Sequence, residues 1–174
     1  MSRGVALAFV TIAAAWLAST AVAARSGPAV SLSPLERGVL AQINQVRAQH
    51  GLGSLRVSVK LNAAARAHSQ QMAADGYFAH ESANGAAFWQ RVKQFYSSSP
   101  WSYWSVGENL LWSSPDVTPA SALTMWMNSP EHRKNILTAR WKEIGVSAVH
   151  VDAAPGVYEG RPVTIVTTDF GIRR

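Results

Sequence analysis

The 174-residue chain contains no cysteine. A disulfide framework is therefore excluded, and so is a cysteine nucleophile. The Gly-x-Ser-x-Gly motif of serine hydrolases is also absent. The segment that starts at His80 begins like a zinc-protease helix, but its fifth residue is Asn84, where that motif needs a second histidine. Covalent hydrolase chemistry thus has no support in the sequence.

Acidic residues are few, because 10 Asp and Glu stand against 16 Lys and Arg, a formal net charge of +6. A basic protein favours anionic partners such as cell-envelope polymers or lipid headgroups. The basic residues are dispersed along the chain, and no nucleic-acid-binding motif is present. We therefore expect no nucleic-acid partner.

The N-terminus has the pattern of an export signal. A basic residue precedes an apolar run from Val5 to Leu17, and Ala21-Val22-Ala23 fits the small-residue rule for cleavage. We predict that residues 1–23 are a signal peptide cleaved after Ala23, so that the protein is secreted and keeps no stable transmembrane anchor. The alternative is an uncleaved anchor, which Ser19 and the alanines disfavour.

Residues 24–32 predict a short linker, and residues 33–174 have the length of one domain, which we expect to be monomeric. Ser33, Pro34 and Glu36 form the pattern of a capped helix start, and Gly51 suits the helix end. Further helices are predicted at about residues 58–75 and 86–95, after Thr118, and after Ser129.

Near the C-terminus the spacing of apolar residues changes from the three to four positions of a helix to every second position. Residues 142–148 and the β-branched run 163–168 predict an antiparallel hairpin with a long loop. Helices followed by strands predict an α+β sandwich in which helices pack on a small central sheet.

Two histidines and a carboxylate stand out as candidate metal ligands: His80, Glu108 and His132. Imidazole nitrogen and carboxylate oxygen both bind Zn²⁺ or another divalent cation, and three protein ligands leave a position open for water or a ligand. The alternative is a hydrogen-bonded polar network that fixes the loop carrying Glu108. His68 lies on the apolar stripe of a predicted helix, so we expect it to be a hydrogen-bonded histidine of the core. We expect His150 to be exposed at the end of a strand.

Seven short motifs follow one another in a specific order. They are Leu61-Asn-Ala-Ala-Ala-Arg-Ala-His-Ser69, Tyr77-Phe-Ala-His80, Gly107-Glu-Asn109, Trp126-Met-Asn-Ser129, His132-Arg-Lys-Asn-Ile-Leu137, Glu143-Ile-Gly-Val146 and Asp169-Phe-Gly171. In this order they resemble a bacterial domain of the CAP superfamily, which contains cysteine-rich secretory proteins, antigen five and plant pathogenesis-related proteins. The resemblance covers roughly residues 35–171 and implies a three-layer α-β-α sandwich with a small, mainly antiparallel sheet.

The resemblance also implies a cleft. The family's tetrad of two histidines and two acids maps onto His80, Glu108 and His132, while the slot of the second acid resembles Ser129. We count Asn109 and Ser129 among the cleft residues. Glu131 is a candidate substitute for the missing acid, although consecutive helix residues point about 100° apart and a first-turn role is favoured.

Three functions remain open. The first is non-catalytic binding of a lipid, sterol or other apolar ligand, as the resemblance implies; the second is a metal-dependent, peptidase-like hydrolase; the third is an envelope- or host-interaction domain that uses its basic surface. Four aromatic residues flank the Glu108 motif and would line either an apolar groove or, as their size favours, the rim of the core: Trp101, Tyr103, Trp104 and Trp112. We favour the first function.

Overall fold

The computed structural model describes Met1 and residues 30–174. The predicted signal peptide and most of the predicted linker lie outside the described residues. In the part described, no helix is both long and apolar enough to cross a membrane.

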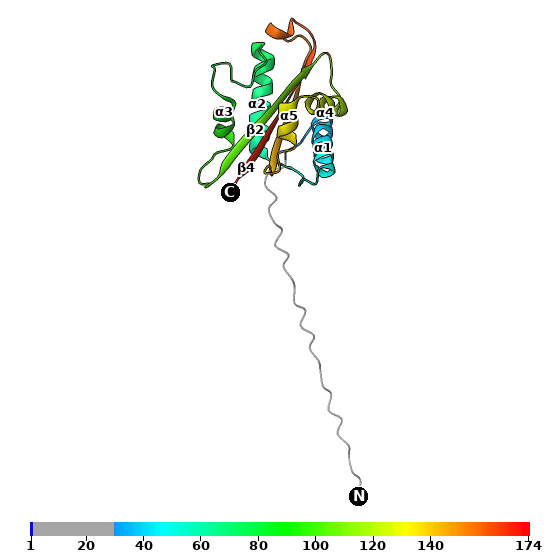
Figure 1. Ribbon diagram of the computed structural model, residues 1–174, viewed down its shortest axis with the longest axis vertical. Coiled ribbons are helices and arrows are strands. Elements are labelled where there is room, and N and C mark those ends of the chain that lie inside the picture. The colour runs from blue at the N-terminus through cyan, green and yellow to red at the C-terminus, as the bar shows by residue number, and fades with distance from the viewer. Residues whose placement is uncertain (2–29) are drawn as a thin grey trace.

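Five helices and four strands make up the domain (Figure 1). The helices are α1 (Pro34–Gln49), α2 (Val59–Asp75), α3 (Phe88–Phe95), α4 (Pro119–Met127) and α5 (Pro130–Ile136). The strands are β1 (Arg56–Val57), β2 (Trp104–Ser113), β3 (Glu143–Val151) and β4 (Val163–Arg173). These bounds confirm the predicted helices to within two residues, while the strands extend further than the sequence indicated.

Local capping chemistry explains where the first helix begins. The Ser33 hydroxyl accepts a hydrogen bond from the Glu36 backbone N–H, and the Glu36 carboxylate accepts one from the Ser33 N–H. Thr118 and Ser121 cap α4 in the same reciprocal way. Because each pair satisfies backbone donors that a helix start leaves open, both predicted starts are confirmed.

The sheet has the strand order β1-β3-β4-β2. β4 pairs antiparallel with both β2 and β3, which confirms the predicted hairpin, while the short β1 pairs parallel with β3. Glu108 and Asn109 lie within β2, at the sheet edge, so the expectation of a loop there is wrong.

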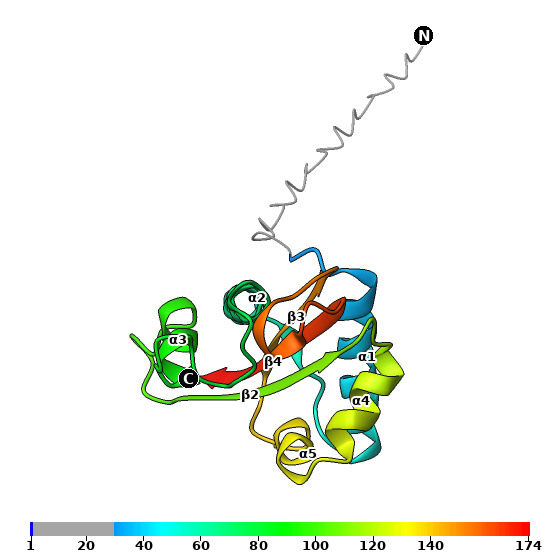
Figure 2. The ribbon, with the colours of Figure 1, turned by 90° about the horizontal axis from the view of Figure 1, so that it is seen from above.

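Helices cover both faces of the sheet, as Figure 2 shows from above. Side chains of α1, α4 and α5 pack with β3 and β4 on one face, and side chains of α2 and α3 pack on the other. This confirms the three-layer α-β-α sandwich. Successive strand residues alternate between the two layers, so Glu108 faces α2 and α3 whereas Asn109 faces α5.

Candidate functional site

His80 and Glu108 form the centre of the site. His80 lies in the loop between α2 and α3, and its Nδ1 is 2.8 Å from Glu108 Oε1. The Glu108 side chain is fully buried, whereas that of His80 is 46% exposed. The predicted pairing of these two residues is therefore present, and the free edge of the imidazole ring faces outward.

Arg91 of α3 is the third member of this cluster. Its Nη2 lies 2.5 Å from Glu108 Oε2, and its Nη1 donates to the His80 carbonyl and to Ser82 Oγ, each over 3.1 Å. The guanidinium therefore neutralises the buried carboxylate and holds the loop that carries His80. Sequence reasoning missed Arg91, because a single arginine on an amphipathic helix ordinarily faces solvent.

Asp169 of β4 adds a second carboxyl group beside Glu108. The two residues are direct partners across β2 and β4, and Asp169 is completely buried. Burial, and then the charge of Glu108, raise the pKa of Asp169 well above its usual value, although Arg91 opposes this. The surroundings of Asp169 therefore favour its neutral, protonated form, and the Arg91 guanidinium is paired with the neighbouring Glu108.

His68 anchors the backbone just ahead of His80. It is completely buried on α2, and its Nε2 lies 2.9 Å from the Ala79 carbonyl oxygen. Burial is the main cause that lowers the pKa of His68 to about 4, so the ring is neutral and Nε2 carries the proton. The prediction of a hydrogen-bonded core histidine is confirmed.

Asparagine side chains tie α5 to the edge strand. Asn109 Nδ2 donates to the His132 carbonyl over 3.0 Å, and Asn135 Nδ2 lies 3.0 Å from the Glu108 carbonyl and 2.9 Å from Asn109 Oδ1. Asn109 thus positions the backbone of His132. Asn109 itself is completely buried, and its place in a cleft stays a prediction.

The outer edge of β2 is closed by these contacts. Two of its outward carbonyls are occupied, that of Glu108 by Asn135 and that of Leu110 by the Trp126 indole N–H at 3.0 Å. An edge strand with occupied acceptors is a poor template for pairing with another chain.

Ser129 and His132 line a pocket of about 290 Å³ beside this edge. The rest of its lining is apolar: Phe78, Leu110, Leu111, Trp112, Met125 and Trp126. Burial and then the nearby His80 lower the pKa of His132, which keeps the ring neutral at pH 7. The pocket therefore combines an apolar wall with a hydroxyl and a neutral imidazole.

The aromatic residues around Glu108 divide between the two predicted roles. Trp112 lines the pocket and packs edge-on against Tyr158, with ring centroids 5.3 Å apart. Trp101 and Tyr103 are 44% and 37% exposed, and arginine guanidinium groups lie over their rings. These two residues do not line the pocket.

The structure brings the predicted metal ligands together only in part. Within residues 30–174, no three His, Asp or Glu side chains are grouped closely enough to hold a metal ion. Both Glu108 oxygens already have partners, so the available donors are the imidazoles of His80 and His132. Glu131 is exposed in the first turn of α5, the favoured position for an acidic residue there. The three-ligand metal site stays a prediction.

The fold is a three-layer α-β-α sandwich with a polar cluster and a pocket at the edge strand β2. The family model described as "CAP: Cysteine-rich secretory protein family" matches residues 40–167. The chain belongs to the CAP family.

Relatives in bacteria agree with this assignment. The chain is 36% identical to the uncharacterized protein YkwD of Bacillus subtilis over 119 residues, which are 68% of this chain and 44% of YkwD. It is 30% identical over 111 residues to the membrane protein YlbC of the same organism, over 64% of this chain and 30% of YlbC. The chain thus spans less than half the length of these relatives.

Solved structures share the fold. An extracellular protein containing an SCP domain from Bacillus anthracis is 29% identical, with a TM-score of 0.58 over 86% of this chain and 45% of that one. An outer surface protein from Borrelia burgdorferi gives a TM-score of 0.66 over 86% of this chain and 100% of that one, at 17% identity. The latter likeness concerns the fold alone.

Proposed function

We propose that this CAP domain is a secreted, non-catalytic binding protein whose pocket beside β2 takes the apolar part of a ligand. One observation carries the proposal: the pocket of about 290 Å³ has an apolar wall and only Ser129 and His132 as polar lining residues. Met125 at its rim is 45% exposed, an unusual position for a large apolar side chain. Ligand pockets in proteins begin at about 300 Å³, so the volume of this pocket is near their lower end. It suits the end of one acyl chain or a single ring.

The polar end of the pocket limits the ligand's head group. The neutral His132 ring and the Ser129 hydroxyl both donate and accept hydrogen bonds. Neither supplies a fixed charge. A carboxylic acid, ester or sterol-type hydroxyl head group would find a partner here.

Binding is favoured over hydrolysis by the state of Glu108. A hydrolytic general base needs a carboxylate that reaches the substrate or its water. Glu108 is fully buried, and both of its oxygens are held by His80 and Arg91. Its role is to fix the loop rather than to accept a substrate proton.

Two arginines cannot contribute to a basic binding surface, because their side chains are buried in the interior. Arg47 is completely buried and donates to the carbonyls of Gly53, Ile136 and Thr138, and Arg91 is paired with Glu108. Anionic envelope polymers remain a secondary partner class for the other dispersed arginines and lysines.

Secretion is supported by the export pattern of residues 1–23 and by the extracellular relative from Bacillus anthracis. Sequencing the N-terminus of the exported protein tests it. A start at Ala24 is expected, and retention of Met1 in the mature protein would contradict the signal peptide.

A lipid-binding experiment tests the pocket. Organic extraction and mass spectrometry of the purified protein, followed by titration with medium-chain fatty acids, should show binding. Met125→Gln keeps the side-chain length but adds a polar amide, and we expect affinity to fall about tenfold. Thr124→Gln on the exposed side of α4 is the matched control. Absence of both extracted and titratable lipid would refute the proposal.

A divalent cation is a second candidate, favoured by the orientation of His80. A ligating imidazole commonly uses its other ring nitrogen to hydrogen-bond a carboxylate, as His80 Nδ1 does with Glu108 Oε1. His80 Nε2 and the His132 ring would then hold the ion, with Glu108 orienting His80. A bound ion would polarise a ligand oxygen or activate water, the chemistry of the metallohydrolase alternative.

Metal analysis separates this candidate from the lipid pocket. Stoichiometric zinc that disappears in His80→Ala/His132→Ala would support the site, and zinc that persists in the double variant would refute it. Peptidase activity that is insensitive to chelators and to Glu108→Gln would exclude the metallohydrolase.

A further inference from the structure

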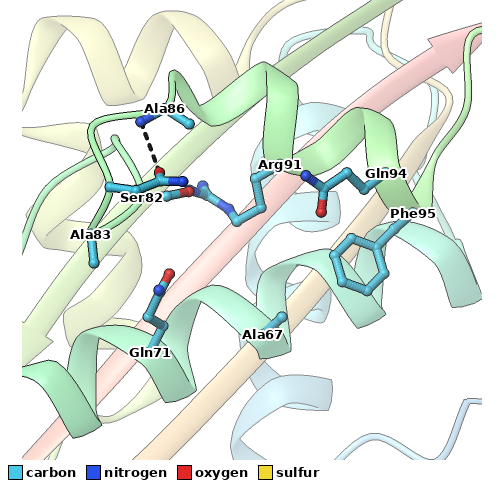
Figure 3. Close-up of a pocket in the computed structure, with 9 residues that line it drawn as sticks. Ala67, Gln71, Ser82, Ala83, Ala86, Arg91, Gln94 and Phe95 are labelled. Carbon is cyan, nitrogen blue, oxygen red and sulfur yellow. Dashed lines mark hydrogen bonds between the residues drawn. The ribbon is translucent and has the colours of Figure 1, made fainter.

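A second groove lies between α2 and α3, on the face of the sheet opposite α5 (Figure 3). Its volume is about 480 Å³, and it shares no lining residue with the pocket beside β2. No acidic residue lines it, and its one cation, Arg91, is paired with Glu108 at 2.5 Å. The groove is therefore electrically neutral, which disfavours an ion as its ligand.

Two amide side chains in the groove have their acceptor ends occupied. The Tyr77 hydroxyl donates to Gln71 Oε1 over 3.0 Å, and the Ala86 N–H donates to Asn84 Oδ1 over 3.1 Å. An amide group has one oxygen acceptor and one NH₂ donor end. Gln71 and Asn84 consequently present their donor ends to a ligand, and in Figure 3 Gln71 rises from α2 into the space below α3.

Ser82 supplies a further donor, held in place by the buried Arg91. Arg91 is 6% exposed, and its Nε is buried without a hydrogen-bond partner. Its Nη1 donates to Ser82 Oγ over 3.1 Å, so the Ser82 hydroxyl proton is left for another acceptor.

The rest of the lining is small or aromatic. Alanines such as Ala67 leave room above α2, and the Phe95 ring stands at one end of the groove in Figure 3. An aromatic face packs well against the C–H face of a sugar ring. An extended peptide is disfavoured, because the lining comes from α2, α3 and the loop between them and offers no strand edge for backbone pairing.

We propose that the α2–α3 groove binds a neutral N-acetylated sugar. Its acetamido carbonyl and ring oxygens accept hydrogen bonds from Gln71, Asn84 and Ser82, and one ring face packs on Phe95. The proposal is independent of the lipid pocket, since the two sites share no residue.

Titration of the purified protein with triacetylchitotriose, followed by NMR of backbone amides, tests the proposal. The expected result is a saturable set of shifts confined to α2, α3 and the loop between them. Cellotriose, which has hydroxyls in place of the acetamido groups, should bind at least about tenfold more weakly because the donors lose their carbonyl partner. Equal binding of cellotriose, or stronger binding of an acetylated dipeptide, would overturn it.

Isosteric variants locate the binding. Gln71→Glu and Asn84→Asp keep the oxygen that faces Tyr77 or Ala86 but remove the NH₂ donor, and each should weaken binding about threefold to tenfold. Gln45→Glu on the exposed side of α1 adds the same charge away from the groove and should leave affinity unchanged. No shifts in the groove, or unchanged affinity in both groove variants, would overturn the proposal.

Discussion

Glu108 and Asp169 face each other directly across β2 and β4, both are buried, and the guanidinium of Arg91 is paired with Glu108. Ionising both carboxyls would leave an uncompensated negative charge in the interior, which is strongly unfavourable. The raised pKa of Asp169, caused by burial and then by the charge of Glu108, favours the state in which Asp169 keeps its proton. Glu108 is thereby kept as a single charge that orients His80 and is balanced by Arg91.

Asp169→Asn should stabilise the protein more as the pH rises. The raised pKa means that folded Asp169 keeps its proton where the unfolded residue has lost it, so this group lowers stability as pH rises above about 4. The amide cannot ionise. We expect the difference in unfolding free energy between variant and parent to grow as the pH rises above about 4, by at most about 1.4 kcal/mol per pH unit, measured by urea denaturation. A difference that does not change with pH would contradict a protonated Asp169.

Arg91→Met should destabilise the protein by about 3–5 kcal/mol, because it leaves Glu108 buried without its main partner. Urea denaturation at pH 7 measures this loss. Arg66→Met on the exposed side of α2 is the control and should change stability by less than about 0.5 kcal/mol.

A rescue experiment shows whether the charge is the cause. Replacing Glu108 as well, in Arg91→Met/Glu108→Gln, removes the stranded charge and should recover more than half of the loss. If the double variant is as unstable as Arg91→Met, lost packing rather than the charge pair explains the effect.

His68 should make the protein less stable in acid. Its folded pKa of about 4 lies below the ordinary 6.5, so the unfolded chain binds the extra proton between these values. Stability from this group is complete above pH 6.5 and falls as the pH drops towards 4, by about 3 kcal/mol. His68→Gln retains a donor for the Ala79 carbonyl and should flatten this part of the pH profile. The ionisation of Asp169 changes stability with pH in the opposite direction, so His68→Gln must be compared with the parent at each pH. Identical pH profiles of the two proteins would rule out His68 as the cause of the acid destabilisation.

Gly145→Ala should disrupt the packing of α2 on β3. A Cβ at Gly145 would lie 2.1 Å from the backbone carbon of Leu61, which neither element can avoid without moving. We expect a loss of more than about 3 kcal/mol or failure to fold. Gly53→Ala, where a Cβ meets no atom within 4 Å, is the control. Thermal unfolding of both variants is the measurement, and similar melting temperatures would contradict the close contact.

Sequence patterns predict the helices well because their signals are local. The Ser33–Glu36 capping box, and Gly76 in a left-handed conformation at the end of α2, each need only neighbouring residues. The patterns do not predict β1 and β2, for a physical reason. β1 is two residues long, and β2 carries buried residues on consecutive positions from Gly107 to Leu111 because helices cover both faces, which removes the alternation that identifies a strand.

Within the site, the sequence predicts only the residues whose side chains are typical metal ligands. The pairing of His80 with Glu108 follows from a family resemblance, but Arg91 and Asp169 act through contacts 17 and 61 residues away from Glu108, which only the fold reveals. Asp169 belongs to one of the seven motifs, yet no role for it follows from the sequence. The pairing of two buried carboxyl groups on neighbouring strands cannot be predicted from the spacing of nearby residues in the sequence.

Mapping a fatty acid onto the protein by NMR tests the proposed function most directly. Titration with decanoate should shift the amides of Phe78, Leu110 and Trp112, which line the pocket beside β2, and saturate at one equivalent. The same titration of Met125→Gln should need about ten times more ligand. Shifts that are absent, or that fall outside the pocket and do not change in Met125→Gln, would contradict an apolar binding site beside β2.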